Sequence, residues 1–257
     1  MTPNKGLLEG QRDTDWLGGT IPFEERNPSA DWTSCLPPGE RQKPNNVDTM
    51  ACVTFSLLNV LETQLKFYGK DRNFSDRYTA KKSGTTTQGN YLYRVADAVR
   101  NGVVPEYLWP TPQDFTWETY YADIPALPIT NLSVRYEFLS DLSRENLKHE
   151  LKHTPLQVTI PGHAVLLYKS DQVDHYFDSY SPFLKTWTSP FRAALKMVYY
   201  DNVNDTPMTK AEVTKLYVLA FYREPDAGEL AHWEGKPLKE FLSTAIKDRA
   251  AFLKAHE

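Results

Sequence analysis

The fold of this chain is decided by Asn46-Val-Asp-Thr-Met-Ala-Cys52-Val-Thr-Phe-Ser-Leu-Leu-Asn-Val-Leu-Glu62. The stretch begins as a polar loop, passes through a single cysteine and continues as an apolar run. Its apolar side chains, with one from the next turn, recur on about one helical face: Phe55, Leu58, Leu61 and Leu65. This spacing predicts a buried helix from Cys52 to about Phe67, with Gly69 as a suitable stop.

Cys52 is therefore expected in the first turn of a buried helix. Unpaired backbone N–H groups and the helix dipole favour a negative charge there, which biases a thiol towards the nucleophilic thiolate. The alternative is a small apolar residue at a helix start, which is the commoner role of a lone cysteine. The choice between them depends on residues much farther along the chain.

Composition limits the classes of function. The chain has 257 residues, which suits one large domain, or a medium domain with a small one. A net charge of −4 gives no electrostatic footprint for nucleic acid. No run of about 18 apolar residues and no apolar leader occur, so we expect neither a membrane span nor a secretory signal. Two cysteines, Cys35 and Cys52, make no disulfide framework, which favours a reducing compartment or a virus particle.

Before the Cys52 helix, residues 1–45 are rich in proline, glycine and charge, which predicts an irregular arm packed on a domain surface. Its apolar anchors are Trp16, Leu17, Ile21, Phe23 and Trp32. After the helix, Arg77 to Asn90 is polar and predicts a loop. Tyr91 to Asn101 has helical spacing with Gly102 as the stop, and Val103 to Asp123 predicts an ordered loop.

The second half changes from helical to strand periodicity. The predicted strands are Leu132–Phe138, Leu156–Ile160, Ala164–Tyr168 and Val173–Phe177, and Thr186–Asp201 is mixed. Ser143 opens a short amphipathic helix that ends at His153. Asn202 to Pro207 is a turn-rich linker, and we expect helices over Thr209–Phe221 and Leu238–Lys254 beyond it.

A histidine and an aspartate meet on the predicted hairpin. If Ser170-Asp171 forms a two-residue turn, His163 lies directly opposite Asp178. The carboxylate would then fix the tautomer of the imidazole and stabilise its charged form. A one-residue change of register would place the two side chains on opposite faces. A nucleophile at a helix start, with a base and an orienting group on a hairpin, is the arrangement of thiol catalysis.

The order of several short motifs resembles the papain-like cysteine peptidases over about Trp32 to Trp187. Asp31-Trp32 precedes the nucleophile as it does in that family, and Cys52-Val-Thr-Phe-Ser is similar to the family's Cys-Trp-Ala-Phe-Ser. The remaining motifs, which resemble cleft and catalytic segments of the family, are Gly89-Asn90-Tyr91-Leu92-Tyr93, Asn101-Gly102-Val103-Val104, Gly162-His163-Ala-Val and Asp178-Ser179-Tyr180.

The resemblance implies an α+β fold with an N-terminal helical subdomain, an antiparallel β subdomain and, here, a small C-terminal all-α domain. It implies Cys52 as nucleophile, His163 as general acid and base, and Asp178 as the orienting residue. Substrate-binding residues carried over from the family are Gly89, Asn90 and Tyr180.

Some positions depart from the family pattern. The family's oxyanion-hole glutamine becomes Asn46, a shorter amide, and Gln42 is a second candidate with a poorer spacing. The backbone N–H of Cys52 would be the other donor. Asp48 adds a negative charge near the thiol and is expected to raise its pKa. An aspartate in the third catalytic position also resembles bacteriocin-processing peptidases, and transglutaminase-like enzymes use the same Cys, His, Asp order.

A second motif, His149-Glu150-Leu151-Lys152-His153, fits the zinc-protease pattern H-E-x-x-H. Lys148 and Lys152 make this a solvated face, Pro155 ends the helix almost at once, and no third ligand follows at a family spacing. We therefore expect a surface helix, no metal and no organic cofactor.

The sequence divides into an arm over 1–45, a peptidase domain over 46–201 and a helical attachment domain over 208–257. Residues from about Met208 resemble a small helical domain of unknown function found in bacterial surface and phage proteins. Within it, Pro225 to Gly228 predicts a turn, and Leu230 and Trp233 lie on the next helix. Its expected role is docking to a protein partner. A simple helical extension that stabilises the peptidase domain is the alternative.

The leading hypothesis is a cysteine peptidase that cleaves a peptide or protein substrate through a thioacyl-enzyme at Cys52. The alternatives are a catalytically weak or inactive papain-like structural component of a phage particle, and a transglutaminase-like acyl transferase. The expected location is the bacterial cytoplasm or a phage particle. No inhibitory segment is evident ahead of the peptidase domain, so we expect any activity to be controlled in another way.

Overall fold

The computed structural model describes residues 4–12, 15, 17–112, 114–200, 213–214, 217 and 224–234. The chain divides into two compact units, Met1–Tyr199 and Tyr200–Glu257, and each is described by itself. The predicted linker over 202–207 lies outside the described residues, as do Trp16 and the predicted helix over 238–254. No helix among the described residues is long and apolar enough to cross a membrane.

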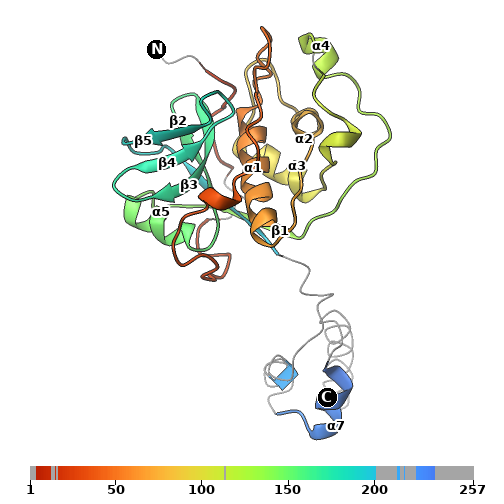
Figure 1. Cartoon of the computed structure of the whole chain (residues 1–257), viewed down its shortest axis with the longest axis vertical. Helices are drawn as coiled ribbons and strands as arrows, with labels where there is room; N and C mark the ends of the chain where they lie inside the picture. The colour runs from red at the N-terminus through yellow and green to blue at the C-terminus, as the bar shows by residue number, and fades with distance from the viewer. Residues whose placement is uncertain are drawn as a thin grey trace. The chain divides into compact units, whose positions relative to one another are not determined.

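Helix α1 (Cys52–Phe67) is the centre of the first unit, as the sequence predicts. Side chains on every face of it are buried from Cys52 to Leu65, because it lies between the sheet and helices α2 (Asp76–Lys82) and α3 (Leu92–Arg100) (Figure 1). Gln64 joins the helix to the sheet: its Nε2 donates to the Met197 carbonyl, and its Oε1 accepts from the Tyr199 N–H, both at 2.9 Å. Gly69 follows with a φ of +73°, a conformation suited to a helix stop.

The sheet is antiparallel and has six strands in the order β1-β6-β2-β3-β4-β5. The strands are β1 (Val134–Phe138), β2 (Leu156–Ile160), β3 (His163–Ser170), β4 (Asp174–Phe177), β5 (Leu184–Trp187) and β6 (Ala194–Tyr199). The predicted strands from Leu132 to Phe177 are confirmed. β5 and β6 lie within or beside the segment that the sequence leaves as mixed.

Shorter helices complete the first unit: η1 (Thr33–Cys35), α2 (Asp76–Lys82), α3 (Leu92–Arg100), η2 (Glu106–Leu108), α4 (Trp117–Tyr120) and α5 (Arg144–Leu151). The prediction of a loop from Arg77 was wrong, because α2 occupies its first part. The polar residues of this segment form a buried helix because their side chains find hydrogen-bond partners. Ser75 caps the helix by accepting from the Tyr78 N–H, and the Arg77 Nε donates to the Tyr120 carbonyl at 2.6 Å.

The predicted N-terminal arm packs against the sheet through a buried ionic group. Glu137 on β1 accepts from the N–H and hydroxyl of Thr20 and from the N–H of Ile21, each at 2.8 Å. Lys196 on β6 pairs with Glu137 at 2.5 Å and with Glu150 at 3.0 Å. Among the predicted apolar anchors that the structure describes, Ile21 and Trp32 are buried, whereas Leu17 and Phe23 are exposed.

Only one of the two histidines of the H-E-x-x-H motif lies in α5, which ends at Leu151. His149 is exposed and its ring stacks on Phe23 at 4.2 Å, as expected for a surface helix. His153 is only 1% exposed, so the prediction of a solvated face was wrong there. Glu150 is engaged by Lys196, and no group of three metal-ligating side chains occurs among the described residues.

Acid is expected to destabilise the fold through His153. Burial lowers the pKa of His153 to about 4 from an ordinary 6.5, so the unfolded chain takes up this proton at a higher pH than the fold. The stability that His153 contributes at neutral pH is therefore lost as the pH falls from about 6.5 to about 4. Measured by urea denaturation, the free energy of unfolding of His153→Leu relative to that of the wild type should increase as the pH falls across that range. The role of His153 would be contradicted if the difference in unfolding free energy between His153→Leu and the wild type did not change with pH. It would also be contradicted if His149→Leu showed the same pH dependence.

In the second unit, α7 (Ala227–Trp233) is described with the Asp226 capping box at its start. Leu230 and Trp233 lie on this helix as predicted, and Trp233 Nε1 donates to the Tyr217 hydroxyl at 3.1 Å. The helix already includes Ala227 and Gly228, so the predicted turn is shorter than expected.

Candidate active site

Cys52 is the first residue of α1, and its thiol is completely buried. The sulfur lies beside the start of β3, where the Ala164 backbone N–H interacts with it. Burial raises the pKa of the Cys52 thiol to about 12, and the charges of Asp48 and Asp178 act in the same direction. The expected effect of Asp48 is thus present. In this closed arrangement, however, burial outweighs the bias towards thiolate that the helix start was predicted to give.

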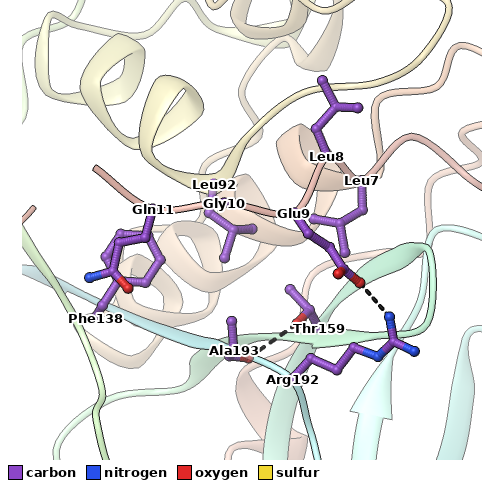
Figure 2. A pocket seen from close by; sticks show the side chains of 10 residues that line it. All are labelled: Leu7, Leu8, Glu9, Gly10, Gln11, Leu92, Phe138, Thr159, Arg192 and Ala193. Atoms are coloured by element: carbon purple, nitrogen blue, oxygen red, sulfur yellow. Dashed lines mark hydrogen bonds and ion pairs between the residues drawn. The ribbon is translucent and has the colours of Figure 1, made fainter. Parts of the chain in front are cut away.

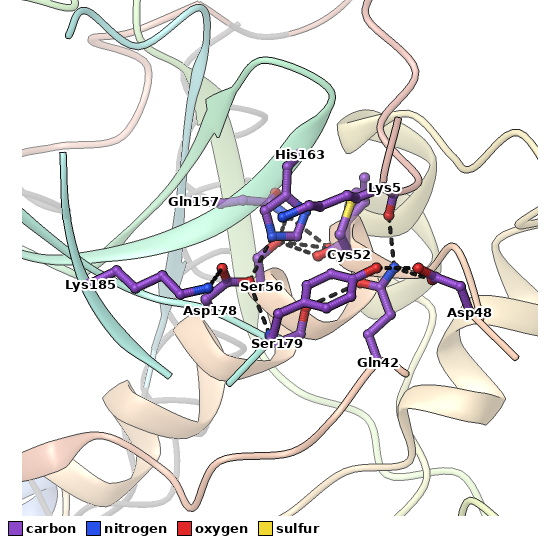
Figure 3. Close-up of polar contacts among 12 residues, drawn as sticks. Lys5, Gln42, Asp48, Cys52, Ser56, Gln157, His163, Asp178, Ser179 and Lys185 are labelled. Carbon is purple, nitrogen blue, oxygen red and sulfur yellow. Dashed lines mark hydrogen bonds and ion pairs between the residues drawn. The ribbon is translucent and has the colours of Figure 1, made fainter. Parts of the chain in front are cut away.

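His163 begins β3 and is 1% exposed. Its Nε2 lies 2.7 Å from Asp178 Oδ1, and its Nδ1 has no hydrogen-bond partner in the part of the chain that the structure describes. In Figure 3 the imidazole and the Cys52 side chain are drawn in the same part of the site, and Ala164, whose N–H interacts with the sulfur, directly follows His163. Burial lowers the pKa of His163, although the Asp178 carboxylate acts to raise it. The ring of Tyr180 packs edge-on against the imidazole at 5.4 Å.

The hairpin that joins His163 and Asp178 differs from the predicted one. A bulge after Leu167 and a longer turn at 171–173 shift the register, so that Leu166 pairs with Phe177. Continued along the strands, this register sets Tyr180 opposite His163, and Asp178 becomes a diagonal neighbour on the same face. The predicted two-residue turn was therefore wrong. The contact survives because the shift preserves the alternation of side chains between the two faces.

Asp178 is held from a second side by Lys185 on β5. The Lys185 Nζ lies 2.6 Å from Asp178 Oδ2, and the aspartate side chain is 2% exposed. Burial alone would raise the pKa of Asp178, but the hydrogen bonds and charges of His163 and Lys185 lower it overall. Sequence reasoning missed Lys185, because the strand that carries it has no distinctive motif.

The amide at the site comes from Gln42 rather than Asn46. Asn46 is exposed, whereas Gln42 is completely buried and its Nε2 donates to the Lys5 carbonyl at 2.7 Å and to Asp48 Oδ1 at 2.8 Å. The assignment of Asn46 is corrected accordingly. The physical reason is that the middle of the loop between Gln42 and Cys52, which includes Asn46, lies at the surface.

Asp48 and Tyr180 hold the Gln42 amide in one orientation. Asp48 accepts from Gln42 Nε2 and from the Tyr180 hydroxyl, while Ser179 Oγ donates to Gln42 Oε1 at 3.1 Å (Figure 3). The network joins the loop before α1 to the segment after β4. It leaves one Gln42 N–H directed at the carbonyl of Lys5.

The chain's own N-terminal residues cross this site. The Lys5 N–H donates to the Gly162 carbonyl at 2.8 Å, next to His163. Residues 4–9, called the N-terminal strand below, form an isolated bridge to Asn90 through Leu7. The Asn90 backbone donates to Gly6 at 2.9 Å and accepts from Leu8 at 2.8 Å. These contacts cover the residues assigned to substrate binding.

The three predicted substrate-binding residues therefore face the N-terminal strand. A Cβ on Gly89 would lie 2.1 Å from the Gly6 carbonyl oxygen, so only glycine permits this approach. The Asn90 backbone forms the hydrogen bonds described above. The Lys5 ammonium lies over the Tyr180 ring, 4.7 Å from its centroid.

A cavity of about 200 Å³ lies beside this strand, where the two halves of the unit meet (Figure 2). Leu7 and Leu92 supply apolar walls, and Thr159 and Arg192 come from the sheet side. Arg192 also pairs with Glu9 at 2.5 Å at the edge of the cavity.

Comparisons with known proteins identify the fold. No protein-family model matches the sequence, and no curated protein matches it. The structure resembles the Amb a 11 cysteine protease of ragweed pollen in its proform, with 13% identity, a TM-score of 0.51, and coverage of 71% of this chain and 68% of that chain. It also resembles bromelain of Ananas comosus in complex with the E64 inhibitor, with 14% identity, a TM-score of 0.51, and coverage of 66% and 98%.

A third similar structure is procathepsin B of Trypanosoma congolense, with 12% identity, a TM-score of 0.50, and coverage of 71% of this chain and 80% of that chain. These neighbours are cysteine proteases. Identities this low establish the fold alone, and the predicted α+β papain-like fold is confirmed.

Proposed function

We propose that this chain is a papain-like cysteine peptidase that hydrolyses peptide bonds through a thioacyl intermediate on Cys52. The observation that carries the proposal is the buried His163–Asp178 pair, because the residue after His163, Ala164, interacts through its N–H with the Cys52 sulfur at the start of α1. Because Asp178 engages Nε2, the tautomer with the proton on that nitrogen leaves Nδ1 free to accept the thiol proton.

Each residue would have one task once a peptide occupies the site. His163 Nδ1 takes the proton of Cys52, and the sulfur attacks the substrate carbonyl carbon. The oxyanion accepts hydrogen bonds from Gln42 Nε2 and from the Cys52 N–H, which has no intrahelical acceptor at the first position of α1. The C–N bond then breaks, and His163 gives its proton to the departing amine. Water, deprotonated by His163, hydrolyses the thioester and restores the thiol.

The complete burial of Cys52 favours one competing interpretation, a protein that kept the fold without catalysis. The pH dependence of Cys52 alkylation separates the two. Because iodoacetamide reaches the sulfur only when the site opens, the pH profile of the rate reports the pKa of the thiol in the open state. Cys35, which is partly exposed, is the internal reference in the same mass spectrum.

A peptidase should show a Cys52 profile with an apparent pKa well below about 8.5, which is lost in His163→Ala. A profile that is the same in both proteins and rises only above that value would contradict the proposal.

Lys185 is expected to act as a positioning residue for Asp178. Lys185→Met removes the 2.6 Å partner that helps to lower the pKa of Asp178, so the acid limb of the pH–rate profile should move to higher pH. We expect a loss of roughly tenfold in kcat/KM near pH 5, and recovery of most of it in Lys185→Arg. An unchanged acid limb in Lys185→Met, or no recovery in Lys185→Arg, would refute the role.

A further inference from the structure

The Asp48 carboxylate, in the loop before α1, contacts the amide assigned to the oxyanion. We propose that Asp48 is a positioning residue for peptide hydrolysis, which fixes the Gln42 side chain so that one N–H of its amide is directed at the oxyanion. This role rests on the proposed function, because an oxyanion forms only if Cys52 attacks a carbonyl. Asp48 would thus serve the reaction, although its charge, after burial, helps to raise the pKa of the Cys52 thiol.

The Gln42 amide nitrogen has two acceptors. It donates to Asp48 Oδ1 at 2.8 Å and to the Lys5 carbonyl at 2.7 Å (Figure 3). Because the amide group is planar, fixing one N–H on Asp48 also fixes the direction of the other. The second N–H already meets a carbonyl oxygen, that of Lys5. A substrate carbonyl at the same place would meet the same donor.

The Asp48 carboxylate is itself held by three donors. Its Oδ1 accepts from the Met50 N–H at 2.9 Å as well as from Gln42, and its Oδ2 accepts from the Tyr180 hydroxyl. Met50 has a φ of +54°, a left-handed conformation that residues other than glycine keep only when their surroundings hold them. Rotation of the carboxylate would break these hydrogen bonds, so the Gln42 amide is held against a rigid acceptor.

Two substitutions separate the acceptor at position 48 from its charge. Asp48→Ala removes both, whereas Asp48→Asn removes the charge and keeps an oxygen that can accept from Gln42 and from the Met50 N–H. We expect Asp48→Ala to lower kcat on an unstructured peptide by about tenfold or more, with little change in KM, because the oxyanion is absent from the ground state. Asp48→Asn should retain most of kcat. Equal losses in the two variants would overturn the role.

A double-mutant cycle tests whether Asp48 acts through Gln42. Gln42→Ala removes the donor itself and should lower kcat by about 10²- to 10³-fold. If Asp48 only positions this donor, Asp48→Ala should cause no further loss once Gln42 is absent. Losses that multiply in the double variant would show that Asp48 acts by another route and would overturn the role.

All these proteins carry Gly6→Ala. An added Cβ at Gly6 would lie 2.1 Å from the Met50 carbonyl oxygen, which is incompatible with the N-terminal strand lying across the site. Asn45→Ala is the matched control, because Asn45 Oδ1 accepts from the Val47 N–H at 2.9 Å in the same loop. It removes a hydrogen bond like that between Asp48 and Met50, and it should leave kcat unchanged.

Far-UV circular dichroism verifies that each variant is folded. If Asp48→Ala does not fold, Tyr180→Phe takes its place in the cycle, because it removes a donor to Asp48 Oδ2 and leaves the bond to the Met50 N–H. Tyr180→Phe should lower kcat when Gln42 is present and have no effect in Gln42→Ala. An equal loss in both backgrounds would overturn the role.

Iodoacetamide labelling at pH 7 separates the oxyanion from the thiolate. Loss of the Asp48 charge favours the Cys52 thiolate, so the Cys52 rate relative to Cys35 should be equal or higher in Asp48→Ala while kcat is lower. A Cys52 rate that falls in parallel with kcat would overturn the role. No cleavage by the Gly6→Ala protein itself would reject the proposed function and this role together, whereas cleavage with multiplying losses would reject only the role of Asp48.

Discussion

His163→Ala should reduce peptide hydrolysis by about 10²- to 10⁴-fold. The comparison is made in Gly6→Ala protein, because a Cβ at Gly6 would lie 2.1 Å from the Met50 carbonyl oxygen and is incompatible with the N-terminal residues lying across the site. In the proposed mechanism the imidazole both removes the thiol proton and returns it to the leaving amine, so the substitution removes both proton transfers. The rate is to be measured as kcat/KM on an unstructured peptide, with the folded state verified by circular dichroism.

The matched control is His149→Ala, whose ring is exposed on α5. It should leave kcat/KM unchanged in the same background. A His163→Ala protein that retains more than about a tenth of the activity would show that another group performs the proton transfers.

Lys196→Ala is expected to destabilise the fold by about 3–5 kcal/mol. The substitution leaves the fully buried Glu137 carboxylate without its cation, and an unpaired buried charge is costly. Glu137 also accepts the hydrogen bonds of Thr20 and Ile21, so the arm should loosen together with the edge of the sheet. Urea denaturation at pH 7 measures the change.

Lys152→Ala provides the comparison, because the Lys152–Glu25 pair at 3.4 Å is exposed and such pairs contribute about 0–1 kcal/mol. A loss below about 1 kcal/mol in Lys196→Ala, similar to that in Lys152→Ala, would contradict the importance of the buried group.

The parts of the fold that sequence reasoning predicted correctly are those with a clear periodicity. The apolar repeat after Cys52 and the alternation after Pro155 belong to elements whose side chains pack against one another. Their buried positions therefore recur with the period of a helix or a strand, and the sequence pattern predicts them. The contact between His163 and Asp178 was predicted for the same reason. The predicted hairpin register was wrong, but the true register keeps both side chains on the same face of the sheet.

Other features depend on tertiary contacts that no local pattern encodes. Helix α2 is polar in sequence because Arg77 donates to main-chain carbonyls inside the fold. Gln42 lies at the site because of the path of the loop before α1, and its separation from Cys52 along the sequence does not predict this position. The sequence of residues 4–9 has no strand periodicity. Its backbone hydrogen bonds go to Asn90 and Gly162, which lie in loops far along the chain, so no local pattern indicates them.

The central claim is that an opened site cleaves peptides through Cys52. The most direct measurement incubates an unstructured peptide mixture with Gly6→Ala and with Gly6→Ala/Cys52→Ala, and identifies new termini by mass spectrometry. New carboxyl and amino termini are expected with the first protein and none with the second. Folded Gly6→Ala protein with an accessible Cys52 thiol that yields no new termini, or equal cleavage by both proteins, would contradict it.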